Sequence, residues 1–225
     1  MKRRTKMLRL IFIVISLIGF QFFLSFLSLY SENDCSPVPG GNKCDAKIRS
    51  SKFGNVILQQ TPVWCWAATL QMIFRWYGKN ISQKNIVLQT FGAVVALPAD
   101  PFVLVNSIKK SYTDDSGNIF QVNSEIWSQD FNIYQLDNYS LINELSAEHP
   151  MIVCNSSHMM VLIGVCYFRP QFGPLQLIQA WVADPFLSGQ VTPDLPSGYR
   201  YLFPYEMIPT MNGGQLRFVA AVSVY

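Results

Sequence analysis

The stretch QQTPVWCWAA, residues Gln59 to Ala68, decides how this chain is interpreted, because it places a cysteine directly after a proline-containing loop. From Cys65 to Tyr77 the residues are good helix formers with a nearly continuous apolar surface, and Gly78 follows as a helix stop. We therefore predict a buried central helix that begins at Cys65. The unpaired amides and positive dipole of its first turn favour a nucleophilic thiolate. The alternative interpretation is a cysteine that only packs in the core.

Two later residues are candidates to act with this cysteine. His158 is one of only two histidines and directly precedes the apolar run 159–165, and Asp184 ends the run 177–183 before Pro185. Because both lie near the ends of successive strands, antiparallel pairing would bring the carboxylate beside the imidazole. The three residues would then form a nucleophile, a base and a group that orients the base. A buried structural histidine and a turn-forming Asp-Pro pair are the alternatives.

The remaining periodic segments place helices first and strands later. This order predicts an α+β domain rather than a parallel βαβ array. Residues 120–126 and 131–136 are too mixed in pattern to assign. The predicted helices span residues 82–89, 101–110 and 139–148, and the predicted strands span 151–154, 158–168, 175–182 and 215–224.

Positive charge is concentrated at the start of the chain. Of its 225 residues, the first nine carry five of the 17 Lys and Arg side chains, and without them the net charge changes from +3 to −2. The rest of the chain is therefore not a basic nucleic-acid binder. Residues 10–30 contain no charge and would span roughly 31 Å as a helix, enough to cross a bilayer. The basic flank predicts that the following residues lie outside.

We divide the chain into a signal peptide or signal-anchor helix at 1–30, a stalk at 31–52 and a domain at 53–225. Whether the first segment is cleaved is left open. The protein is expected to be exported, either secreted or anchored in the inner membrane and facing the periplasm or the extracellular side. A disulfide between Cys35 and Cys44 is one of two interpretations that remain open. Cys154 and Cys166 are expected to be unpaired strand thiols.

Gln59 followed by WCWAA, then His158 with MMVLIGV, then Asp184-Pro185, resembles the papain-like cysteine peptidases. The pattern is most similar to their bacterial branch with a WCWAA motif, and also to bacteriocin-leader peptidase domains. The resemblance covers residues 53–225. It implies a helical part that carries the nucleophile, packed on an antiparallel sheet that carries the histidine and the aspartate.

The resemblance also implies roles for individual residues. Cys65 would attack the scissile carbonyl, His158 would be its ion-pair partner and protonate the leaving amine, and Asp184 would orient the ring. The spacing in the family selects Gln59 to join the Cys65 N–H in an oxyanion hole, while Gln60 remains an alternative.

The leading hypothesis is therefore a cysteine peptidase that acts on a peptide or protein. Two alternatives use the same fold: an acyltransferase or amidase that forms the same cysteine thioester, and a catalytically silent peptide-binding homologue. We expect no cofactor and no metal, because two histidines are too few for a typical site. Nucleic acid is not an expected partner, the membrane is contacted through the N-terminal helix, and the oligomeric state is left open.

Overall fold

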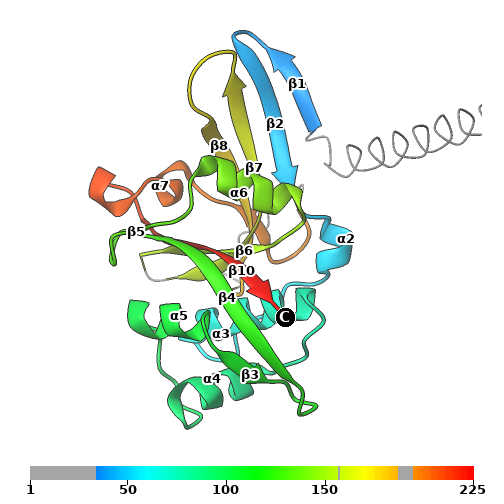
Figure 1. Ribbon diagram of the computed structural model, residues 1–225, viewed down its shortest axis with the longest axis vertical. Helices are drawn as coiled ribbons and strands as arrows, with labels where there is room; N and C mark the ends of the chain where they lie inside the picture. Colours follow the sequence, from blue (N-terminus) through cyan, green and yellow to red (C-terminus); the bar gives the residue numbers. More distant parts are fainter. Residues whose placement is uncertain (1–33, 157, 187–194) are drawn as a thin grey trace, which may run out of the picture. The chain divides into compact units, whose positions relative to one another are not determined.

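The computed structural model describes residues 34–156, 158–186 and 195–225, all within one compact unit (Figure 1). The predicted signal or anchor segment at 1–30 lies outside the described residues. Within the described part of the chain, no helix is long and apolar enough to cross a membrane.

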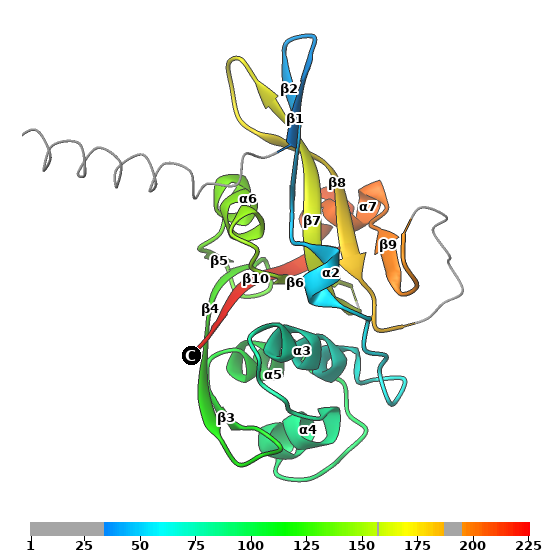
Figure 2. The ribbon, with the colours of Figure 1, turned by 90° about the vertical axis from the view of Figure 1, so that its right-hand side faces the viewer.

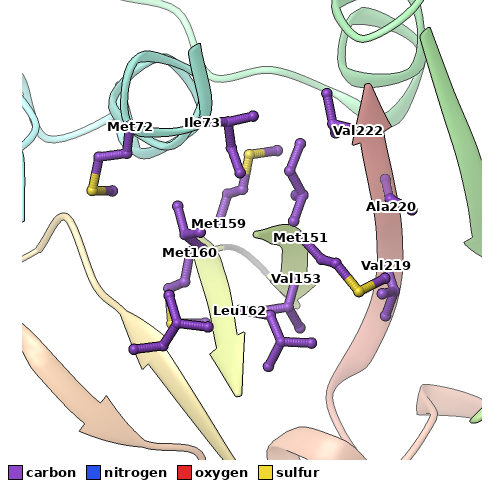
Figure 3. Packing of buried hydrophobic residues seen from close by; sticks show 14 of the residues in the cluster. Met72, Ile73, Met151, Val153, Met159, Met160, Leu162, Val219, Ala220 and Val222 are labelled. Carbon is purple, nitrogen blue, oxygen red and sulfur yellow. The ribbon is translucent and has the colours of Figure 1, made fainter. Parts of the chain in front are cut away.

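Helix α3, Cys65–Trp76, is the central helix, and it begins and ends as the sequence predicts to within one residue. Most of its side chains are buried, because apolar residues surround nearly its whole circumference. Ile73 points toward Met159 at the start of a strand (Figure 3). This core holds the helix that carries Cys65 against the sheet.

Two other helices begin where the sequence predicts, one after the cap Ser82 and one at Pro101. The Ser82 hydroxyl accepts a hydrogen bond from the Asn85 N–H at the start of α4 (Gln83–Phe91). Helix α5 (Pro101–Ser107) is capped by Asp100 and ends three residues earlier than predicted. The remaining helical segments are α2 (Ser50–Phe53), α6 (Asn138–Ser146), α7 (Pro204–Met207) and a 3₁₀ turn at Thr210–Asn212.

The described residues form ten strands that pair antiparallel in one continuous sheet. The main order is β1-β2-β7-β6-β10-β4-β3, with β5 beside β4 and β8 between β7 and β9. The bounds are β1 Asp34–Val38, β2 Gly41–Lys47, β3 Ser111–Thr113, β4 Ile119–Ser128, β5 Ile133–Tyr134, β6 Met151–Asn155, β7 Met159–Pro170, β8 Gln176–Ala183, β9 Tyr199–Tyr201 and β10 Leu216–Val224.

Strand β7 is the centre of this sheet. One of its edges pairs first with β6 and then with β2, and its other edge pairs with β8. Its first nine residues are buried, which explains why the sequence shows a continuous apolar run there instead of alternation. In the β7–β8 register Val161 faces Ala183, so His158 and Asp184 lie at the same end of the pair.

A two-stranded arm replaces the stalk that we predicted. Residues 34–47 form the hairpin β1–β2, which pairs with β7 and is closed by a disulfide between Cys35 and Cys44. The prediction of an irregular linker is therefore wrong for these residues. Their Pro and Gly content is typical of a loop. Pro37 is nevertheless tolerated in β1, because β1 is an edge strand and a residue there can lack a backbone N–H without losing a hydrogen bond between strands.

Helices α3, α4 and α5 gather at one end of the unit, and the hairpins β1–β2 and β7–β8 extend from the opposite end (Figures 1 and 2). Helix α6 packs on β2 and β7. The chain thus has the α+β architecture that the sequence predicts, with a helical part that packs on an antiparallel sheet. Of the unassigned segments, 120–126 lies within β4 and 131–136 contains β5.

Candidate active site

Cys65 is the first residue of α3, and its thiol meets groups that precede and begin β7. It is hydrogen-bonded to the His158 side chain and to the backbone N–H of Met159. The Thr69 hydroxyl, fully buried one turn along α3, donates to the Met159 carbonyl at 3.1 Å. Both polar groups of Met159 are therefore used to dock the start of α3 on the start of β7.

His158 lies between the thiol and a carboxylate. Its Nε2 is 2.6 Å from Asp184 Oδ1, which leaves Nδ1 for Cys65. Asp184 Oδ1 also accepts from the Phe186 N–H at 2.8 Å, and the Phe186 ring packs edge-on against the imidazole with 6.2 Å between ring centroids. The structure thus brings Cys65, His158 and Asp184 together in one contiguous row.

The charges in this row support one another. Burial by itself would raise the pKa of the Cys65 thiol, but the hydrogen bonds from His158 and Met159 and the positive imidazolium hold that pKa below its usual value. Burial would lower the pKa of His158, yet Asp184 and the thiolate together raise it to about 9. Burial opposes ionisation of Asp184 as well, and its bond to His158 holds the pKa of the carboxyl below its usual value.

The structure also distinguishes the two glutamines that the sequence left open. The Gln59 N–H donates to Pro185 O at 3.0 Å and its side-chain Nε2 to Thr61 O at 2.9 Å. Its side chain lines the cavity at Cys65, and its Oε1 is buried with no hydrogen-bond partner among the described residues. Gln60 is exposed, and the residues that line the cavity in the described chain do not include it.

A cavity of about 470 Å³ opens beside Cys65, a size typical of small-ligand and peptide side-chain sites. Its walls are mostly apolar, with an ion pair between Arg217 and Asp130 at 2.8 Å among the polar groups. Its lining residues are Gln59, Pro62, Val63, Cys65, Trp66, Pro98, Ala99, Pro101, Leu104, Ser128, Asp130, Cys154, Asn155, Ser156, His158, Met159, Phe186, Arg217 and Phe218.

The two tryptophans on either side of Cys65 hold one wall of this cavity. The Trp64 indole N–H donates to Val95 O at 3.0 Å and the Trp66 indole N–H to Leu97 O at 3.3 Å. These bonds place Pro98 and Ala99, the residues directly after Leu97, in the cavity wall near the start of α3. The WCW motif therefore has a structural role in addition to presenting the cysteine.

A second cysteine, Cys154, lines the same cavity. Burial, and then the negative charge of a Cys65 thiolate, raise the pKa of Cys154 to about 12. Cys154 is unpaired, as is Cys166. Of the two free thiols that line the cavity, Cys65 has a pKa below its usual value and Cys154 has a pKa above it.

Sequence reasoning missed Arg200 and Glu206. Arg200 Nε donates to Asp184 Oδ2 at 2.7 Å, and the other guanidinium nitrogens contact Glu206 at 2.8 and 2.9 Å. Arg200 lies in the short strand β9 and Glu206 in the single turn α7, neither of which has enough length to produce a periodic pattern. A buried charged pair in that segment has no local sequence signal.

A family model described as papain-like cysteine protease AvrRpt2 matches residues 48–167, more than half of the chain, and this range includes Cys65 and His158. One similar solved structure is a double glycine motif protease from an AMS/PCAT transporter in complex with the leader peptide, at 15% identity and a TM-score of 0.40. The alignment covers 84% of this chain and 96% of that chain. No curated protein matches.

Proposed function

This chain belongs to the papain-like cysteine protease family, and we propose that it cleaves peptide bonds through Cys65, His158 and Asp184, with Gln59 in the oxyanion hole. Family membership makes it a cysteine-type peptidase. The assignment of the individual residues is our proposal. It is supported most directly by the unbroken contact from the Cys65 thiol through the His158 ring to the Asp184 carboxylate.

In the proposed reaction the Cys65 thiolate attacks the scissile carbonyl carbon. The oxygen of the resulting tetrahedral intermediate accepts hydrogen bonds from the Cys65 N–H, which as a first-turn amide has no intrahelical partner, and from the Gln59 amide. His158 gives its Nδ1 proton to the leaving amine as the C–N bond breaks, which leaves a thioester. Water then loses a proton to His158, attacks the thioester carbon, and releases the carboxylic acid and the thiolate.

Asp184 remains ionised throughout this cycle. Its contact with Nε2 holds the ring in the tautomer that presents Nδ1 to the sulfur and stabilises the imidazolium. Gln59 has a second amide hydrogen, because only one is used by Thr61 O. That hydrogen is available to the oxyanion.

The proposal is tested by incubating the protein with a mixed peptide library and analysing the products by mass spectrometry. We expect hydrolysis products from the wild type and none from Cys65→Ala. The matched control is Cys154→Ala, which makes the same change at the other thiol of the cavity and should retain hydrolysis. Cleavage that survives Cys65→Ala, or that is lost only in Cys154→Ala, would contradict the proposed nucleophile.

Adding an amine nucleophile to the same incubation separates hydrolysis from acyl transfer. A peptidase gives mainly carboxylic acid products, whereas an acyltransferase gives amide exchange products in excess of hydrolysis. We expect the acid products to dominate. Predominant exchange would assign the same thioester chemistry to transfer instead.

We also propose that the catalytic domain acts outside the cytoplasm, either secreted or anchored by the N-terminal segment. The uncharged run at residues 10–30 after a basic flank supports this proposal. The disulfide between Cys35 and Cys44 supports it independently, because such bonds persist mainly in oxidising compartments. Cell fractionation of a tagged chain tests it, and recovery only from the cytoplasm would contradict it.

A further inference from the structure

We propose that Arg200 and Glu206 are positioning residues for the reaction: Arg200 holds Asp184 against His158, and Glu206 balances Arg200 and, through Asn155, ties the network back to the His158 backbone. This inference rests on the proposed function, since it assigns a task to groups that touch Asp184 and not the substrate. Four observations support it.

The first observation is the arrangement of donors around Asp184. Its Oδ1 accepts from His158 and from the Phe186 N–H, and its Oδ2 accepts from Arg200 Nε at 2.7 Å. In the β8–β9 register Val182 faces Arg200, so the guanidinium comes from the strand that pairs with β8, and Asp184 directly follows β8. With donors on both oxygens, the carboxylate has no freedom to rotate away from the imidazole.

The second observation is that Glu206 uses both of its oxygens on fixed donors. Its Oε2 accepts from Arg200 and from the Phe203 N–H, each at 2.8 Å. Its Oε1 accepts from Arg200 at 2.9 Å and from Asn155 Nδ2 at 2.8 Å. The planar guanidinium therefore bridges two carboxylates, an arrangement that a lysine ammonium could not reproduce.

The third observation is that the network closes on itself. Asn155 Oδ1 accepts from the His158 N–H at 3.2 Å, and the Asn155 N–H donates to His158 O at 3.1 Å. A continuous path thus runs from the His158 ring through Asp184, Arg200, Glu206 and Asn155 back to the His158 backbone. The ring and the backbone of the same histidine are held by one polar circuit.

The fourth observation is that three buried side chains carry charges of alternating sign, negative on Asp184, positive on Arg200 and negative on Glu206. The side chains of Asp184, Arg200 and Glu206 are 8%, 12% and 5% exposed. Without Glu206, the positive charge of Arg200 would weaken the attraction between Asp184 and the imidazolium, and without Arg200 no positive charge would lie between the two buried carboxylates. A buried ion pair contributes little net stability compared with apolar residues, so we attribute its presence here to geometry and charge at the triad.

The test follows the titration of His158 by NMR of ¹³C-labelled histidine. The chain has two histidines, so a His149→Asn background leaves His158 as the single signal. In the parent the midpoint is expected at about 9. Glu206→Gln removes one negative charge with little change in shape, and the midpoint should fall by roughly half a pH unit because the imidazolium loses stabilisation.

Two further variants complete the experiment. Glu148→Gln makes the same chemical change at an Arg49–Glu148 ion pair outside the network and should leave the His158 midpoint where it is. Arg200→Lys keeps the charge but not the double bridge, and should also lower the midpoint, since Asp184 is no longer held on its outer oxygen. This second variant provides the answer if Glu206→Gln does not fold.

A merely structural role predicts a different result. If folded Glu206→Gln and Arg200→Lys have lower melting temperatures but the same His158 midpoint as the parent, the positioning proposal is overturned. The proposed function is judged separately, by loss of peptide hydrolysis in Cys65→Ala. Unchanged midpoints together with that loss would therefore reject the inference and leave the function standing.

Discussion

At the scale of single residues, the candidate site depends on a competition between burial and hydrogen bonding. Burial opposes charge on both Cys65 and His158, and the contacts between them and with Asp184 favour it. The contacts prevail, so the pKa of the thiol lies below its usual value and that of the imidazole is about 9. Both shifts therefore favour the thiolate–imidazolium form of the pair.

The lowered pKa of the Cys65 thiol and the raised pKa of His158 predict a bell-shaped dependence of peptidase kcat/KM on pH. Activity should rise as the Cys65 thiol ionises, below the pH of an ordinary thiol, and fall as His158 loses its proton near pH 9. Asp184→Asn removes the negative charge that raises the pKa of His158, so the descending limb should move to lower pH. Rates measured between pH 4 and 10 check both statements, and a profile without a descending limb would count against the pairing.

A second residue-scale prediction separates the two glutamines. Gln59→Ala should lower kcat roughly 100-fold with little change in KM, because the lost donor contacts the substrate oxygen mainly in the transition state. Gln60→Ala is the matched control and should behave like the wild type, since that side chain is exposed. Steady-state kinetics on a peptide substrate decide between them. A large loss in Gln60→Ala instead would transfer the role to Gln60.

At the scale of elements, the site depends on how α3 docks on β7. Met159 is the joint between them, because its N–H faces the Cys65 thiol and its carbonyl accepts from Thr69. Ile73, which points toward Met159, supports the same joint from the core side (Figure 3). The distance between nucleophile and base is therefore set by packing of two elements and not by a flexible loop.

Thr69→Val tests this joint. Valine has nearly the same shape but leaves the buried Met159 carbonyl without its donor, so the free energy of unfolding should fall by about 1–3 kcal/mol. We also expect kcat to fall by roughly tenfold as the thiol and the ring lose alignment. Thr90→Val is the control, since the Thr90 hydroxyl bonds to Ile86 within its own helix and to the Tyr112 side chain, neither of which lies on β7. Equal effects of the two variants on kcat would show that the joint does not align the site.

At the scale of the whole molecule, the arm formed by β1 and β2 is separate from the cavity beside Cys65. The residues that line the cavity in the described chain include none from β1 or β2. The arm pairs with β7 only from Gly164 onward, and it does not pair with the first residues of β7, which lie next to His158. Its disulfide should therefore matter for stability and not for catalysis.

Replacing both Cys35 and Cys44 with serine checks this separation. The disulfide closes a loop with a sequence separation of nine, so its loss should lower the free energy of unfolding by about 2–3 kcal/mol. Peptidase kcat/KM should stay within twofold of the wild type at a temperature where both proteins are folded. Denaturant unfolding and kinetics on the same preparations give both numbers. A large loss of kcat/KM would show that the arm contributes to the site.

Much of the fold was predictable because its elements are long and strongly patterned. The nucleophile helix, the buried face of α6 and the four long strands after it follow from apolar periodicity and caps. Strand β4 was left unassigned although its exposed and buried residues alternate over most of its length, since Ser124 and Ser128 place polar residues on the inward face and interrupt the apolar pattern. The arm was missed because Pro37 and Gly40 are typical of loops.

The candidate site was predictable only where its residues lie at the ends of long elements. Cys65 begins α3, His158 directly precedes β7 and Asp184 directly follows β8, so their order and placement could be inferred. Arg200, Glu206 and Asn155 reach the site through pairing of a three-residue strand and a buried polar circuit. Contacts of this kind depend on tertiary structure and leave no periodic trace in the sequence.

The most direct measurement of the central claim is the rate of Cys65 alkylation by iodoacetamide as a function of pH, followed by peptide mapping. Cys154 and Cys166 serve as internal references, since burial raises the pKa of both thiols. We predict that Cys65 reacts at pH 5–6 at least tenfold faster than an unperturbed peptide thiol and both references, and that His158→Ala abolishes this advantage. If Cys65 reacts no faster than the peptide thiol at pH 5–6, the thiolate–imidazolium pair does not exist and the account is wrong.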